Sequence, residues 1–145
     1  MHPYPHHYSV HAELGTEGPV ALGSAGLPVL ESTPPPEFDG PPGYWSPETL
    51  LLAAAADCYA LSFRAVARAS RLAWDELKVD VQGVLDRIEG VTRFTELRFV
   101  PTLRIPGAEQ QHLAENVLEK AKRVCLITNS LNARSELKAT VVVGR

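Results

Sequence analysis

The stretch from Ser46 to Arg71 most constrains the fold, because it reads as one long and largely apolar helix. Ser46 can cap the first turn, and Pro47 suits the first helical position, where no backbone N–H is needed. We expect this helix to be buried on most sides, with a cysteine on its buried face. Small and apolar residues recur on one face at three- and four-residue steps, namely Leu51, Ala54, Ala55, Cys58, Leu61, Ser62 and Ala65.

Length and charge set the general class of protein. A chain of 145 residues with 45% hydrophobic residues can form a single domain, residues 1–145, with a proper core and a flexible terminus over residues 1–7. A net charge of −3 gives no electrostatic argument for binding nucleic acid or an anionic membrane. Asp57 and Arg64 interrupt the best apolar stretch, so we expect no membrane span. The N-terminus lacks the pattern of a signal peptide, so we expect a cytoplasmic protein.

The N-terminal part predicts short strands followed by a stiff loop. Alternation of apolar and polar residues indicates strands over residues 8–14, 19–22 and 27–31. Proline and glycine dominate residues 33–45, which excludes regular structure there. The aromatic residues of this loop, Phe38, Tyr44 and Trp45, are either a lid over the core or a wall of a site near the helix start.

Four histidines lie close to the N-terminus and raise the question of a metal site. They are His2, His6, His7 and His11. No nearby cysteine and no well-spaced carboxylate completes a set of ligands. We therefore interpret them as a solvated terminus and expect no metal.

The remainder predicts two long strands, a helix and a last strand. Strands are expected over residues 77–88 and 91–105, joined by a tight turn at Glu89-Gly90. Pro101 suggests an edge position or a bulge in the second of them. A helix follows over residues 108–124, then a loop over 126–131 and a strand over 137–143.

The two cysteines occupy comparable places. Cys58 lies on the apolar face of the first helix, and Cys125 ends the apolar stripe of the second. Neither belongs to a CxxC pair or a zinc-like spacing. If the two helices pack side by side, the thiols can meet. They are then either a redox pair or inert core residues.

Two segments around these cysteines resemble the OsmC/Ohr family of organic hydroperoxide reductases. SPETLLLAAAADCYALSF resembles the family's helix with the peroxidatic cysteine, and KAKRVCLITNSL resembles its second cysteine motif. EFDGP matches the family's Phe-x-Gly loop, and the order of the expected elements agrees as well.

This resemblance implies an α+β fold with two long central helices wrapped by antiparallel β-sheets in an intertwined homodimer. It implies a peroxidase in which Cys58 attacks an organic hydroperoxide and Cys125 resolves the sulfenic acid as a disulfide. An external dithiol then reduces the pair, and no cofactor is implied. An apolar substrate pocket walled by Phe38, Tyr44 and Trp45 fits such a substrate.

The family's catalytic arginine has no counterpart here. The attacking sulfur must be a thiolate, and a free cysteine has a pKa of about 8.5. The family places an arginine upstream of the cysteine helix, held by the glutamate that matches Glu48, but this chain has no arginine before Arg64. Arg64 substitutes as charge partner, or a partner subunit supplies an arginine, or Cys58 is a weak peroxidase thiol. Alternatively the protein is an apolar-ligand-binding or redox-sensing module.

Overall fold

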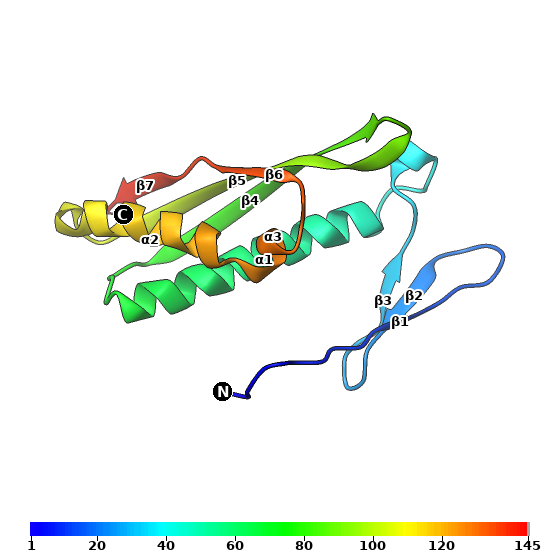
Figure 1. Cartoon of the computed structure of the whole chain (residues 1–145), viewed down its shortest axis with the longest axis horizontal. Helices are drawn as coiled ribbons and strands as arrows, with labels where there is room; N and C mark the ends of the chain where they lie inside the picture. The colour runs from blue at the N-terminus through cyan, green and yellow to red at the C-terminus, as the bar shows by residue number, and fades with distance from the viewer. Residues whose placement is uncertain (145) are drawn as a thin grey trace. The chain divides into compact units, whose positions relative to one another are not determined.

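The computed structural model describes residues 1–144, and these fall into two compact units, Met1–Leu51 and the chain from Leu52 onward (Figure 1). Each unit is described by itself. The expectation of a single domain over residues 1–145 stays a prediction.

The N-terminal unit holds a small antiparallel sheet in the order β1-β2-β3. The three predicted strands are confirmed in place, although the first and third are shorter than predicted. Turns with positive φ at Gly18 and Gly26 precede β2 and β3. A single 3-10 turn follows in the proline-rich loop. The bounds are β1 His11–Glu13, β2 Val20–Gly23, β3 Leu30–Ser32 and η1 Pro36–Phe38.

The long helix α1 spans Pro47–Ala69, close to its predicted range. Ser46 caps it as expected, since its Oγ accepts the backbone N–H of Thr49 at 3.2 Å. Thr49 Oγ1 in turn accepts the backbone N–H of Ser46 at 2.9 Å. This reciprocal pair satisfies N–H groups at the start of the helix that would otherwise lack a partner.

The buried face of α1 differs from the predicted one. Beyond Leu51, the helix buries the face that carries Tyr59 and Phe63, while Cys58 is only half-buried and Leu61 is 53% exposed. The expectation of burial on most sides is therefore wrong for this chain. Apolar side chains occur on all faces of this stretch, so the sequence shows no difference in polarity between one face and another. The bulky aromatic side chains determine which face packs against the core. The buried residues are Ala55, Tyr59, Phe63, Val66 and Ala67.

The apolar character of α1 also bears on the membrane question. An 18-residue window of this helix has a mean hydropathy of 1.5, so by length and composition α1 is able to cross a membrane, despite Asp57 and Arg64. Core helices of soluble proteins meet the same criterion. The aromatic rings of α1 lie in the hydrophobic core, where Tyr59 contacts Phe99 of the sheet at a ring-centroid distance of 5.6 Å.

The second unit is built on a mixed sheet, which confirms the α+β class. β4 (Glu76–Ile88) and β5 (Val91–Ile105) form a long antiparallel hairpin, as predicted. The turn residues Glu89 and Gly90 both have positive φ, 51° and 82°. The predicted last strand is two strands, β6 (Arg134–Leu137) and β7 (Thr140–Val143). Both run parallel to β5, so this sheet is not purely antiparallel.

Pro101 lies in the central strand β5, so the predicted edge position is wrong. The register shift of this hairpin falls at Val84/Leu85, away from Pro101. The Phe99 carbonyl accepts the N–H of Lys138, and alternate residues of a strand point their backbone groups to the same side. The missing N–H of Pro101 therefore faces the break between β6 and β7, where no strand needs it.

The helix α2 spans Gln111–Val124 after a 3-10 turn, η2, at Ala108–Gln110. It buries Ala114, Val117, Leu118 and Ala121. The segment predicted as a loop begins with a short helix, α3, at Leu126–Asn129, which four residues are too few to reveal by periodicity. Both α1 and α2 pack on the sheet face that carries Leu97, Phe99, Leu103 and Ile105.

Candidate dithiol site

Cys125 is a fully buried thiol between two helices. It follows α2 by one position and precedes α3, with an extended backbone at φ −66° and ψ 106°. It continues the apolar stripe of Val117 and Ala121, which points it into the core, where it is 0% exposed. The prediction that Cys125 ends the buried stripe is confirmed.

Cys58 lies in the middle of α1, one residue before Tyr59, at the border between the buried and the open face. It lines a cleft of about 460 Å³ between α1 and α3, which we call the Cys58 cleft. Its walls are almost entirely apolar or small, so it can accept an uncharged organic molecule. The lining residues are Ala54, Asp57, Cys58, Leu61, Ser62, Ala65, Leu126 and Ile127.

The structure brings the two thiols together. Both thiols are free, and Cys58 packs against the core cluster that contains Cys125. It also shares its cleft with Leu126 and Ile127, the two residues that follow Cys125. Burial raises the pKa of the Cys125 thiol, and the neighbouring Cys58 raises it further. The expected packing of the two cysteine-bearing segments is therefore found.

Thr128 acts on Cys125 in the opposite direction. Its hydroxyl donates a hydrogen bond to Cys125 Sγ at 3.1 Å, and this bond and the Thr128 backbone N–H both lower the pKa of Cys125. Sequence reasoning missed Thr128. The contact arises because α3 folds back over the cysteine, with the Asn129 N–H donating to the Cys125 carbonyl at 3.0 Å.

Tyr59 was also missed as part of this site. Tyr59 is 0% exposed, and its hydroxyl donates to the Leu118 carbonyl of α2 at 2.9 Å. Burial, then Glu119, then Cys125 raise its pKa. Its four-residue spacing from Ala55 and Phe63 was the available signal.

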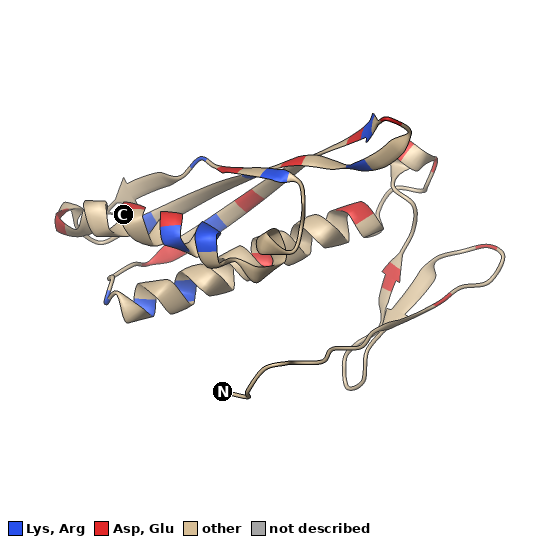
Figure 2. Cartoon of the chain, viewed as in Figure 1, with Lys and Arg blue, Asp and Glu red and all other residues tan. Residues whose placement is uncertain are grey.

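Among residues 1–144, no lysine or arginine lines the Cys58 cleft, and Asp57 is the one charged lining residue. Arg64 is exposed on α1 and is not among the lining residues. It lies six residues beyond Cys58, which turns it about 240° around the helix axis. Figure 2 shows that the basic residues of α1 lie in its C-terminal part. The role of Arg64 as charge partner stays a prediction.

The other predicted site residues belong to the N-terminal unit. Glu48 lies in the first turn of α1, and its Oε1 is buried without a hydrogen-bond partner among residues 1–144. The aromatic side chains of Phe38, Tyr44 and Trp45 are each about half exposed. Their roles in catalysis and substrate binding stay predictions.

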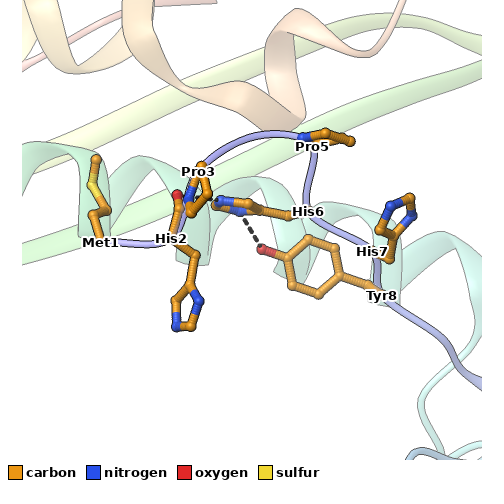
Figure 3. Close-up of a pocket in the computed structure, with 7 residues that line it drawn as sticks. All are labelled: Met1, His2, Pro3, Pro5, His6, His7 and Tyr8. Carbon is orange, nitrogen blue, oxygen red and sulfur yellow. Dashed lines mark hydrogen bonds between the residues drawn. The ribbon is translucent and has the colours of Figure 1, made fainter.

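The N-terminal histidines surround a shallow hollow of about 670 Å³ made by residues 1–8 alone. Figure 3 shows His6 beside the Tyr8 hydroxyl, at 3.2 Å, while His2 and His7 point away from it. No group of three His, Cys, Asp or Glu side chains able to hold a metal occurs in the part of the chain that the structure describes.

Fold and site together define an α+β protein in which a half-buried thiol lines an apolar cleft and a second, buried thiol lies in the adjoining core cluster. The family model described as OsmC-like protein matches residues 40–140. The chain therefore belongs to the OsmC-like protein family, which confirms the resemblance noted in the sequence.

Known proteins similar to this chain fit the assignment. The uncharacterized protein YmaD of Bacillus subtilis (strain 168) is 27% identical over 96% of this chain and 97% of its own length. An OsmC-like protein of unknown function from Vibrio cholerae superposes with a TM-score of 0.83 at 18% identity, covering 93% of this chain and 99% of that one.

A third similar protein comes from Legionella pneumophila. It is described as an organic hydroperoxide resistance protein OsmC, predicted redox protein, regulator of sulfide bond formation. Its TM-score is 0.73 at 26% identity, over 97% of this chain and 100% of that chain.

Proposed function

We propose that this protein is a thiol-dependent peroxidase that reduces organic hydroperoxides. The observation that carries the proposal is the position of Cys58, which lines an apolar cleft with Leu126 and Ile127 and packs against the core cluster that contains the buried thiol of Cys125. The description of the Legionella pneumophila protein as an organic hydroperoxide resistance protein supports the choice of substrate.

The reaction balances as two steps followed by a reduction. The Cys58 thiolate attacks the terminal oxygen of ROOH, the O–O bond breaks, and the leaving alkoxide takes a proton to give the alcohol and a Cys58 sulfenic acid. The Cys125 sulfur then attacks the sulfenic sulfur, releasing water and forming the Cys58–Cys125 disulfide. An external dithiol reduces this disulfide and becomes a disulfide itself.

The thiols have complementary surroundings for these roles. Cys58 is half-buried at the cleft, so a hydroperoxide can reach it, whereas Cys125 is shielded from solvent. A sulfenic acid at Cys58 has a neighbouring thiol to condense with, which protects it from further oxidation. Glu48 and the loop residues Phe38, Tyr44 and Trp45 are proposed to complete the site, as the family resemblance implies.

We also propose that the working form is a cytoplasmic homodimer. The one-sided burial of α1 beyond Leu51, with Leu61 53% and Leu126 65% exposed, supports a second copy that packs beside this apolar surface and leaves the mouth of the Cys58 cleft open. An arginine from that copy is a candidate for the missing positive charge near Cys58.

A second candidate function is the binding of an apolar ligand or the sensing of oxidants, without efficient peroxidase activity. The observation that favours it is the charge of the Cys58 cleft, where the carboxylate of Asp57 is present and no arginine or lysine of the described part of the chain lines the walls. Slow alkylation of Cys58 at neutral pH is expected in that case.

The test is a count of thiols after a single addition of substrate. The reduced protein is mixed with one equivalent of cumene hydroperoxide, and free thiols are measured after seconds and after minutes. If the protein is a peroxidase, we expect both thiols of the wild-type chain to be lost within seconds. In Cys58→Ser we expect the remaining thiol to survive.

Two results would contradict it. Thiols that survive for many minutes would favour the binding or sensing function. Full consumption of hydroperoxide by Cys58→Ser would remove Cys58 from the reaction altogether.

A further inference from the structure

Thr128 is in direct contact with one of the two reacting sulfur atoms, and the proposed chemistry above leaves its hydroxyl unused. The Thr128 hydroxyl donates to Cys125 Sγ at 3.1 Å, and both residues lie within the same turn, formed by the end of α2 and the short helix α3. A hydrogen bond from a hydroxyl to sulfur stabilises the thiolate more than the thiol, because the acceptor is then charged.

The exposure of the two sulfur-bearing residues is unequal. Cys125 is 0% exposed and is not among the residues that line the Cys58 cleft. Cys58 lines that cleft beside Leu126 and Ile127. Since thiol–disulfide exchange requires direct approach to the attacked sulfur, a dithiol arriving from solvent reaches Cys58.

We infer that the dithiol reductant attacks Cys58 of the Cys58–Cys125 disulfide, and that Thr128 is a catalytic residue which stabilises the departing Cys125 thiolate. This inference rests on the proposed function, because the step belongs to the reduction of the disulfide that the proposed peroxidase reaction forms.

In this step a reductant thiolate forms a bond to Cys58 Sγ as the Cys58–Cys125 bond breaks. The electron pair of that bond stays on Cys125, beside the Thr128 hydroxyl. The second thiol of the reductant then loses its proton and attacks the reductant's own sulfur in the mixed disulfide. This releases the Cys58 thiolate and leaves the reductant as a cyclic disulfide.

The surroundings of Cys125 explain why such a donor is needed. Burial raises the pKa of the Cys125 thiol, which would make it a poor leaving group in an apolar interior. The Thr128 hydroxyl and backbone N–H offset part of this effect. A leaving thiol with a lower pKa departs faster, so removing the hydroxyl should slow the exchange.

The experiment prepares the disulfide with diamide, so that it needs no peroxidase activity. Its reduction by dithiothreitol is followed in wild type, Thr128→Val, Thr128→Ser and Ser130→Ala. Valine keeps the shape of threonine without the hydroxyl, and serine restores the hydroxyl. Ser130 is a matched control, because its hydroxyl donates to the Leu126 carbonyl at 2.8 Å rather than to sulfur.

We expect Thr128→Val to slow reduction about 3- to 10-fold, while Thr128→Ser and Ser130→Ala remain close to wild type. A Thr128→Val chain that is reduced as fast as wild type would overturn the role of Thr128.

The attacked sulfur is identified separately in the wild-type chain, which keeps the inference testable even if Thr128→Val fails to fold. The oxidised protein is mixed with glutathione, quenched in acid, and the adduct is mapped by peptide mass spectrometry. An adduct on Cys58 is expected, and one on Cys125 would overturn the inference. Slower reduction of Thr128→Val and an adduct on Cys58 would support this inference even if the protein failed to consume cumene hydroperoxide. That combination would contradict only the proposed function.

Discussion

The Tyr59 hydroxyl donates a hydrogen bond to the Leu118 carbonyl at 2.9 Å, which joins α1 to α2 one residue away from Cys58. The same ring packs on Phe99 of the central strand with a centroid distance of 5.6 Å. The two helices that carry or precede the cysteines are thus held together at the site itself, and the fully buried hydroxyl is satisfied.

Tyr59→Phe should keep the ring contacts and lose this bond. We expect the free energy of unfolding at pH 7 to fall by about 1 kcal/mol, measured by urea denaturation, because a buried hydrogen bond is lost. Tyr44→Phe is the control, since Tyr44 is 47% exposed. An equal loss in both variants would contradict the importance of the Tyr59–Leu118 bond.

The wild-type chain and Tyr59→Phe should also differ in how their free energies of unfolding change at alkaline pH. The pKa of Tyr59 is raised in the folded chain, so its contribution to stability is fully present below the ordinary tyrosine value of about 10 and is lost as the pH rises above it. Between pH 9.5 and 11 the free energy of unfolding should therefore fall less in Tyr59→Phe than in wild type. The difference between the two falls is the contribution of Tyr59 ionisation. Parallel stability curves over this range would refute the prediction.

Asp57→Asn should make Cys58 more reactive. The Asp57 carboxylate lines the same cleft as Cys58, and a negative charge repels a reagent-attacking thiolate that forms beside it. We expect alkylation of Cys58 by iodoacetamide at pH 7 to become about 2- to 3-fold faster at low salt, with a smaller effect at high salt. Asp75→Asn, an exposed change after the helix, serves as the control. An unchanged rate in Asp57→Asn would mean that this carboxylate does not act on the sulfur.

Cys125→Ser should separate the first chemical step from the second. The variant is expected to consume one equivalent of hydroperoxide and to stop at a Cys58 sulfenic acid, which dimedone traps and mass spectrometry detects. Excess hydroperoxide should then drive Cys58 to the sulfinic acid, because no thiol is available to condense with it. Wild type treated in the same way should give little dimedone adduct. Abundant adduct in wild type as well would contradict the resolving role of Cys125.

Gly40→Ala should disrupt the proline-rich loop. A Cβ at position 40 would overlap the Pro34 carbonyl oxygen, a clash that only a backbone shift can relieve. The Gly40 N–H also closes the turn by donating to the Pro35 carbonyl at 3.0 Å. We expect a loss of about 2–4 kcal/mol in the free energy of unfolding. Gly15→Ala, whose added Cβ would lie 3.9 Å from the Glu17 carbonyl oxygen, should be nearly neutral.

Much of the fold was predictable because its signals are local. The cap at Ser46, the alternation along β4 and β5 and the turn at Glu89-Gly90 each depend on neighbouring residues. The buried face of α1 was not predictable in this way, because its own alanine and leucine side chains are spread around the helix instead of marking one face. The division of the last strand was hidden too, since the alternation of side chains continues across Lys138 and Ala139.

The candidate site was predictable to a similar extent. The closeness of the Cys58 and Cys125 segments was predictable from their places on the two helices, and their pairing in a disulfide stays a prediction from the family resemblance. The contact from Thr128 could not be foreseen, because it depends on a helix of four residues that folds back over the cysteine. The absence of an upstream arginine was visible in the sequence, and the cleft walls add Asp57 as an opposing charge.

The position of Pro101 divides one side of the central strand into two hydrogen-bonded ladders. β6 pairs with residues 96–99 of β5 and β7 with residues 102–105, and the proline stands opposite the interval between them. A continuous strand would open as one cooperative unit. Here the amides of β7 can exchange with solvent while those of β6 remain protected, so native-state hydrogen exchange should resolve two opening events along the same edge.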